Sequence, residues 1–263
     1  MYALVTLIAF SIIGLGSAQG QDGEARPLFI EGEILIRGTI ENADNTRVRF
    51  SNFEIIGGTD HLTYLDDDGE FEFRVQVLGA HDSEISIDGQ VVRLFAAPGD
   101  TILIGADMDR FEETLIFGGT RPGTNMSLNV FADTLRLRKE NANFDDKKSN
   151  LPADDFKAFA RDFFRSMDAE IEKIEQEHQP DRHGRAWMRN TLKYQHGEDL
   201  LEFGFGHVDS LPADYFDFDE ELLTVGPYDF ECSQYYDDFM PKYHIRLVLG
   251  QREDFSLLVE QVV

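Results

Sequence analysis

Residues 70–77, Glu-Phe-Glu-Phe-Arg-Val-Gln-Val, alternate without exception between polar and apolar side chains. Successive side chains of a β-strand point to opposite faces of the sheet, so this segment predicts a strand with one face in a core and the other in water. A less regular form of the same period recurs at 34–36, 48–50, 84–87, 91–95, 102–104 and 115–117. Residues 29–119 are therefore expected to form about seven or eight short strands.

Pairs of turn-forming residues separate these segments: Asp44-Asn45, Gly57-Gly58, Asp68-Gly69, Asp88-Gly89 and Pro98-Gly99. Glycine and asparagine supply the positive φ that tight hairpins need, and proline fixes the φ of a turn's first central residue. Short strands spaced about 8–12 residues apart and joined by such turns are typical of an antiparallel sandwich or barrel. No helical pattern intervenes, so parallel strand–helix–strand units are not expected.

Beyond Gly118-Gly119 the apolar period changes to three or four residues, as on one face of a helix. The predicted helices are 126–139, 152–179, 187–194 and 233–249, the last with a kink at Pro241. The polar stretch 141–150 is predicted to be a loop.

The predicted fold class is therefore α+β, with an N-terminal antiparallel β-sandwich followed by an all-helical region. We assign residues 1–18 to a signal peptide, 21–120 to the sandwich domain and 121–263 to the helical region. Both regions are long enough to bury a core, and the 22 phenylalanines favour aromatic packing.

The assignment of the signal peptide rests on an uncharged apolar run at residues 3–16, followed by the small residues Gly16-Ser17-Ala18. The run is too short to span a bilayer. The usual Lys or Arg is missing from Met1-Tyr2, so either the terminal amine carries the positive charge or the true start lies upstream. We expect export to the periplasm or the outer cell envelope, with no membrane insertion after signal cleavage.

The chain is strongly acidic, with 50 acidic and 24 basic residues and a formal net charge of −26. Such a charge repels the phosphates of nucleic acids and anionic lipid surfaces, so nucleic acid is not an expected partner. A cationic partner, a divalent ion or a neutral ligand stays open. The acids are spread along the chain, which favours a role in solubility.

Cys232 is the only cysteine, which excludes an intramolecular disulfide and a cysteine metal cluster. Its neighbours Asp229, Glu231, Asp237 and Asp238 disfavour a thiolate, so we interpret Cys232 as a half-buried small residue.

The acidic segment 66–70, Asp-Asp-Asp-Gly-Glu, invites comparison with a calcium-binding loop. With Gly69 at the sixth position of such a loop, however, Val75 stands where a bidentate Glu is required. We prefer a hairpin turn in which Gly69 supplies the positive φ. A second acidic edge is predicted from Asp100, Asp107 and Asp109. It supports a metal site no better than the segment 66–70 does.

His178 and His183 lie five residues apart and close to His196 in the sequence. Histidine ligands on one helix face need a spacing of about three or four residues, and Pro180 breaks the helix between this pair. We interpret these histidines as surface residues of a loop.

Residues 203–243 interleave aromatic and acidic side chains, which could hold a sugar or a cation. The preferred interpretation is the apolar side of packed helices. No Gly-x-Ser-x-Gly elbow or glycine-rich phosphate loop occurs, and acid pairs are too numerous to single out a glycosidase dyad. The sequence therefore identifies no catalytic, cofactor-binding or metal-binding residue, and we expect neither a cofactor nor catalytic activity.

Four segments carry a family resemblance: the hairpin at 67–73, the Pro-Gly-Asp turn within 94–102, residues 116–119 with Asn125, and the segment 233–239. Together they resemble the N-terminal accessory region of TlpA-like, thioredoxin-fold envelope proteins of Gram-negative bacteria, over roughly residues 28–245. The resemblance implies a place in the envelope and a sandwich followed by helices. The Trp-Cys-x-x-Cys segment that carries catalysis in that family does not occur in these residues, so no catalytic residue is carried over.

Our first hypothesis is a non-catalytic exported binding or scaffolding protein of the cell envelope, with a protein or small ligand of the envelope as its unknown partner. The alternative is an accessory module of a thiol–disulfide oxidoreductase whose thioredoxin domain is missing or separate. A third hypothesis is a hydrolase with dispersed carboxylates. It would require two carboxylates that point into a deep cleft.

Overall fold

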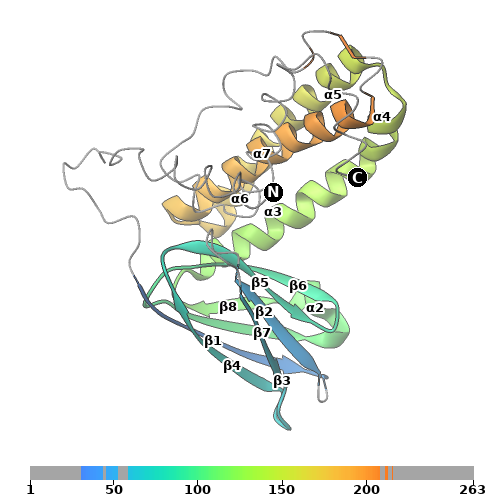
Figure 1. The fold of residues 1–263 in the computed structure, drawn as a ribbon. Coiled ribbons are helices and arrows are strands. Elements are labelled where there is room, and N and C mark those ends of the chain that lie inside the picture. Colours follow the sequence, from blue (N-terminus) through green and yellow to red (C-terminus); the bar gives the residue numbers. More distant parts are fainter. Residues whose placement is uncertain (1–30, 44–45, 53–58, 208–210, 213–214, 216–263) are drawn as a thin grey trace, which may run out of the picture. The chain divides into compact units, whose positions relative to one another are not determined.

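The computed structural model describes residues 31–43, 46–52, 59–207, 211–212 and 215 (Figure 1). Eight strands and then five longer helices follow one another within these residues, which confirms the predicted α+β class. The predicted signal peptide and the predicted helix 233–249 lie outside them.

The strands form two four-stranded sheets, in the orders β4-β1-β7-β8 and β3-β2-β5-β6. Their bounds are β1 Gly32–Glu41, β2 Arg47–Asn52, β3 Thr59–Tyr64, β4 Glu70–Val77, β5 His81–Ile87, β6 Gln90–Ala96, β7 Thr101–Asp107 and β8 Ile116–Gly119. A 3-10 turn, η1 (Met108–Arg110), and one turn of helix, α2 (Phe111–Thr114), join β7 to β8.

One pair of neighbouring strands is parallel, namely β1 and β7, from Leu35 opposite Thr101 to Glu41 opposite Asp107. All other paired strands are antiparallel. Antiparallel neighbours need only a hairpin, whereas β7 returns to β1 after the chain has passed through β5 and β6 of the other sheet. This crossover allows the parallel direction.

The alternation that predicted the strands also fills the sandwich. In β4 every second residue is buried, from Phe71 to Val77, and the residues between them are exposed. The hairpin before β4 turns at Gly69, whose φ is +73° as predicted. A Cβ there would lie 2.4 Å from the carbonyl oxygen of Ile40, so only glycine fits.

The longer helices are α3 Pro122–Asn141, α4 Phe144–Asn150, α5 Ala153–Ser166, α6 Asp168–His178 and α7 Arg182–Gly206. Helices α3 and α7 are longer at both ends than the predicted helices 126–139 and 187–194. Two further differences have a visible cause. The predicted helix 152–179 is interrupted at Met167, whose N–H bonds to the carbonyl of Phe164, three residues back, while the Ser166 hydroxyl donates to the carbonyl of Phe163.

The second difference is α4, which lies in the predicted loop 141–150. The prediction of a loop was wrong because one residue anchors this otherwise polar helix. Phe144 is buried, and its ring contacts four others, those of Phe156, Phe159, Phe163 and Phe164.

The helices pack around an apolar core separate from that of the sandwich. One strand residue, Phe95 of β6, belongs to the helical core. On β6, Val92 and Leu94 belong to the sandwich core. Helix α3 thus packs on β6, Trp187 of α7 bonds to Asp82 of β5, and the candidate site lies at this junction.

Candidate functional site

The edge of β6 is bonded to α3 by asparagine side chains rather than by another strand. Asn129 Oδ1 accepts the backbone N–H of Arg93 at 2.9 Å, and Asn129 Nδ2 donates to the carbonyl of Arg93 at 2.8 Å. Asn125 Oδ1 accepts the N–H of Phe95 at 2.7 Å. The backbone of Arg93 is therefore fixed relative to α3, and its side chain projects from a rigid position.

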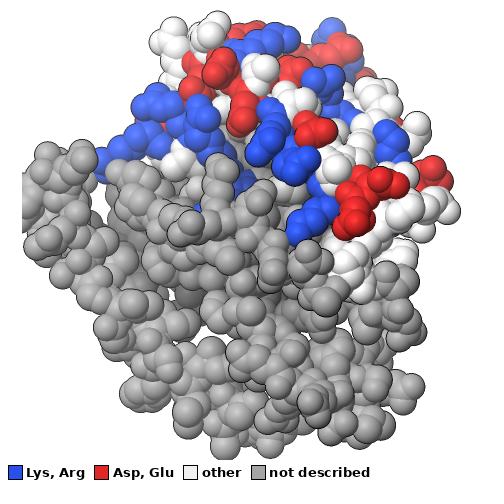
Figure 2. Space-filling view, turned by 90° about the horizontal axis from the view of Figure 1, so that it is seen from above, with Lys and Arg blue, Asp and Glu red and all other residues white. Residues whose placement is uncertain are grey.

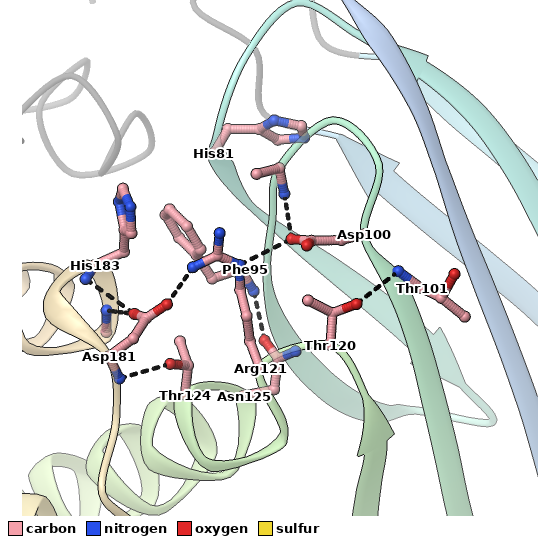
Figure 3. Close-up of polar contacts among 12 residues, drawn as sticks. His81, Phe95, Asp100, Thr101, Thr120, Arg121, Thr124, Asn125, Asp181 and His183 are labelled. Atoms are coloured by element: carbon pink, nitrogen blue, oxygen red, sulfur yellow. Dashed lines mark hydrogen bonds and ion pairs between the residues drawn. The ribbon is translucent and has the colours of Figure 1, made fainter.

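Arg121, just before α3, joins the sandwich to the helices (Figure 3). Its Nε donates to Asp100 Oδ2 at 2.9 Å, and its Nη1 donates to Asp181. Asp100 follows the turn after β6, and Asp181 is the N-cap of α7. Burial alone would raise the pKa of Asp181, but the N–H of Gly184 and the charge of Arg121 outweigh it and lower that pKa.

A pocket of about 510 Å³ lies on the same junction, between β6, α3, the start of α4 and α7, and is called here the α3–α7 pocket. This volume lies in the range of small-molecule sites. Its lining consists of Arg93, Phe131, Ala132, Leu135, Arg136, Lys139, Glu140, Asn143, Phe144, Asp145, Asp146, Trp187, Thr191 and Gln195.

The indole of Trp187 stands against the sandwich at this pocket. Its Nε1 donates to Asp82 Oδ2 of β5 at 3.1 Å, and its ring meets that of Phe131 edge-on with centroids 6.1 Å apart. Trp187 and Phe131 are both almost fully buried. These contacts fix the positions of the Trp187 and Phe131 rings.

Arg93 faces Glu84, its direct cross-strand partner on β5. Arg93 Nε lies 3.6 Å from Glu84 Oε1, which is an ion pair but too long for a hydrogen bond. Burial raises the pKa of Glu84 despite the nearby charge of Arg93. The carboxylate of Glu84 is thus a poorly solvated and loosely held partner.

Two polar groups of the lining have no hydrogen-bond partner within the described part of the chain. They are Arg93 Nε and the hydroxyl of Thr191, a residue that is only 2% exposed. A buried polar group without a partner costs stability, so a ligand that reached either atom would relieve that cost.

The other cations of the lining are already engaged. Arg136 Nη1 donates to Glu140 at 3.1 Å. Lys139 Nζ donates to Asp199 Oδ2 at 2.6 Å and stands 4.6 Å from the centre of the Phe144 ring. Asp199 also accepts from Lys148.

The helices carry a different charge balance from the rest of the chain. Residues 121–207 contain 14 basic and 16 acidic residues, whereas residues 31–120 contain 6 basic and 19 acidic ones. Figure 2, which looks down on the helices, shows both signs side by side. The surface around the pocket therefore lacks the acidic excess of the whole chain.

The residues singled out from the sequence are not brought together. The segment 66–70 is a hairpin turn, as preferred, in which Asp66 Oδ1 accepts the N–H groups of Asp68 and Glu70. Asp107 caps η1 and bonds to Asn42. The prediction that Asp100 forms an acidic edge was wrong, because this carboxylate is buried and paired with Arg121.

The histidines are not surface residues of a loop. His178 ends α6, half-buried, and His183 stacks on Phe95 from the first turn of α7 with ring centroids 5.3 Å apart. His196 is buried against Phe164. Within the described residues no group of three or more His, Cys, Asp or Glu could hold a metal ion.

Cys232 and most of the aromatic residues of 203–243 lie outside the described residues. Phe203 and Tyr215 are buried in the helical core, which confirms the packing interpretation for these two. Burial raises the pKa of the Tyr215 hydroxyl, which donates to the carbonyl of Leu200.

Sequence reasoning missed the α3–α7 pocket altogether. Its one visible signal is the charged Arg93 inside the apolar run 91–95. Thr191 and Trp187 stand in an ordinary helical pattern, which gave no sign that they face a space.

No protein-family model matches the chain, and no curated protein matches it significantly. None of the helices in the described part is long and apolar enough to cross a membrane. A solved structure with some likeness is that of a candidate cell adhesion protein from Bacteroides ovatus ATCC 8483, at a TM-score of 0.23 and 8% identity. The match covers 34% of this chain and 43% of that one, so the chain spans less than half of that protein's length, and a likeness this low carries no argument about fold or function.

Proposed function

We propose that this chain is a non-catalytic, exported binding protein of the cell envelope that holds a small ligand in the α3–α7 pocket. The observation that carries the proposal is a pocket of about 510 Å³ whose lining joins closely packed aromatic side chains to two buried polar atoms without partners, Arg93 Nε and Thr191 Oγ1. Such a combination is typical of ligand sites, because apolar walls supply affinity and a few polar groups fix orientation.

Binding is favoured over catalysis by the chemistry of the lining. The described residues that line the pocket include no His or Cys, and the Thr191 hydroxyl has no base among its hydrogen-bond partners there. The lining offers donors, amides, rings and the carboxylates of Glu140, Asp145 and Asp146. All three carboxylates are exposed to water, so these groups orient a ligand rather than act as activated nucleophiles.

The test is retention of small molecules by the purified protein. The mature chain is mixed with a compound library, passed through gel filtration, and the retained compounds are identified by mass spectrometry. A132W is the blocking variant, because Ala132 is half-buried at the pocket wall and an indole there would fill the space.

The matched control is A169W, the same substitution at an exposed position of α6. We expect compounds that the wild type and A169W retain and A132W does not. Equal retention by all three proteins, or no retained compound, would contradict a ligand site in this pocket.

Export is tested by the N-terminus of the protein recovered from cells. Mass spectrometry is expected to find a chain beginning at Gln19, after cleavage behind Ala18. A chain that keeps Met1 in the cytoplasmic fraction would contradict export.

A second candidate function is an accessory module of a thiol–disulfide oxidoreductase. What supports it is the family resemblance of the segments at 67–73 and 94–102. Reading the DNA beyond codon 263 and in adjacent genes for a Trp-Cys-x-x-Cys segment tests this candidate, and its absence from both would count against it.

A further inference from the structure

We propose that the α3–α7 pocket takes an amphipathic anion, with an apolar ring body inside the pocket and one acidic group on the guanidinium of Arg93. This proposal rests on the proposed function, since it names the ligand class of the same pocket.

Arg93 has donors that the protein leaves without close acceptors. A guanidinium carries five N–H donors in a planar fork that suits carboxylate and similar groups. The side chain of Arg93 is 29% exposed, its Nε has no hydrogen-bond partner, and the closest carboxylate oxygen, that of Glu84, lies 3.6 Å away. An acidic group of a ligand would give these donors the short, charge-assisted bonds that the protein does not supply.

Arg93 also differs from the other cations of the lining. Arg136 and Lys139 each donate a hydrogen bond to a carboxylate of the protein. The carboxylate of Glu140 is held by Arg136, and that of Asp146 accepts from Asn150. The third carboxylate of the lining, that of Asp145, is exposed to water. Arg93 is thus the cation of the lining that lacks a short bond to an acceptor, which favours an anion at this position.

A second polar group, the hydroxyl of Thr191, lies near Trp187 on α7. The hydroxyl of Thr191 is 2% exposed and lacks a partner, and Thr191 lies one helical turn after Trp187 on α7. A further polar atom on the ring body of the ligand would give this hydroxyl the partner that it lacks.

The acidic chain as a whole does not forbid such a ligand. At physiological salt, charges separated by more than about 8 Å are largely screened. The helical residues 121–207 are nearly balanced, with 14 basic and 16 acidic residues. Short-range bonds at Arg93 therefore outweigh the charges of those sandwich acids that lie farther away than Glu84.

The experiment uses two fluorescent probes with the same ring system. Anilinonaphthalene sulfonate carries one acidic group, and phenylnaphthylamine carries none. Dissociation constants are measured for the full mature chain by fluorescence titration, with A132W against A169W to show that the probes occupy the pocket.

The decisive variant is R93Q. It is expected to weaken binding of the sulfonate about tenfold, which is the value of a charge-assisted hydrogen bond, and to change binding of the neutral probe by less than about twofold. R74Q is the matched control, because it removes one positive charge at an exposed position of β4 that does not line the pocket. It is expected to leave both constants unchanged.

E84Q keeps the proposal testable if R93Q does not fold. Removing the carboxylate that faces Arg93 is expected to tighten the sulfonate severalfold and to leave the neutral probe unchanged. A sulfonate affinity that E84Q leaves unchanged or weakens would overturn the proposal, whatever R93Q does.

The outcomes distinguish a failure of the ligand site from a failure of the preference for an anion. If A132W leaves the binding of both probes intact, or neither probe binds the wild type, the proposed ligand site itself fails. If A132W blocks both probes but R93Q changes both equally, the ligand site stands and the preference for an anion is wrong.

Discussion

At the scale of single residues, the unusual feature of this protein is a group of polar atoms enclosed without good partners. Arg93 and Glu84 face each other across two strands at 3.6 Å, and Thr191 keeps its hydroxyl unbonded within the described part. Proteins rarely leave such atoms unpaired, because each one loses its hydrogen bonds to water on folding. Other such atoms lie away from the pocket, at Asn52, His81, Ser83 and Asn125, whereas Arg93 Nε and Thr191 Oγ1 belong to residues that line one space.

The hydroxyl of Thr191 gives a prediction about stability. T191V replaces the unpartnered hydroxyl with a methyl group of nearly the same shape, so it is expected to raise the free energy of unfolding of the free protein by about 1 kcal/mol. Urea denaturation followed by circular dichroism measures the change. A loss of stability would show that the hydroxyl has a partner in the folded protein.

Glu84 gives a prediction about pH. Burial raises its pKa above the value of 4.5 that the unfolded chain would show, so its ionised form destabilises the fold. The destabilisation is absent below pH 4.5, where both states are protonated, and complete once the pH exceeds the folded-state pKa.

E84Q is therefore expected to raise the melting temperature at neutral pH, and the gain is expected to shrink as the pH falls through this window. Thermal melts of the wild type and E84Q across a pH series measure it. A gain that is constant with pH, or largest in acid, would contradict the assignment.

At the scale of elements, α3 does the work that a further strand would do at the edge of β6. Its asparagines bond the backbone of Arg93 and Phe95, so the edge groups of the strand are satisfied by side chains. An open sheet edge invites pairing with another chain, and covering it with a helix removes that hazard. The same bonds fix the distance from α3 to β6 and so help to shape the pocket.

N129A is expected to lower the free energy of unfolding by about 1–3 kcal/mol, because it leaves the N–H and carbonyl of Arg93 without partners. N141A is the matched control, since Asn141 is exposed at the end of the same helix. Urea denaturation of both variants measures the difference. Equal effects of the two substitutions would show that the asparagine contacts do not hold the edge.

At the scale of the whole described molecule, two apolar cores meet at a polar junction. The ion pairs of Arg121 and the bond from Trp187 to Asp82 cross that junction. Phe95 extends the helical core onto the strand. These contacts are expected to couple the cores, so that sandwich and helices unfold together.

Trp187 is the one tryptophan of the chain, which makes its fluorescence a direct reporter of the junction. We expect urea transitions followed by this fluorescence and by far-ultraviolet circular dichroism to coincide. A fluorescence transition at clearly lower urea would mean that the helices leave the sandwich before either core unfolds.

The amino-acid sequence by itself determined the strands other than β3, the turns at Gly69, Gly89 and Gly99, and most of the helices, because each of these depends on a period of two or of three to four residues, or on glycine at a positive φ. The strand β3 has no buried residue and therefore no apolar alternation to reveal it. It did not reveal α4, whose single anchor is Phe144, or the parallel pairing of β1 with β7, because both depend on where distant parts of the chain lie. The α3–α7 pocket belongs wholly to the tertiary structure. Arg93 and Thr191 are 98 residues apart, and only the packing of α7 on β6 and α3 brings both to one space.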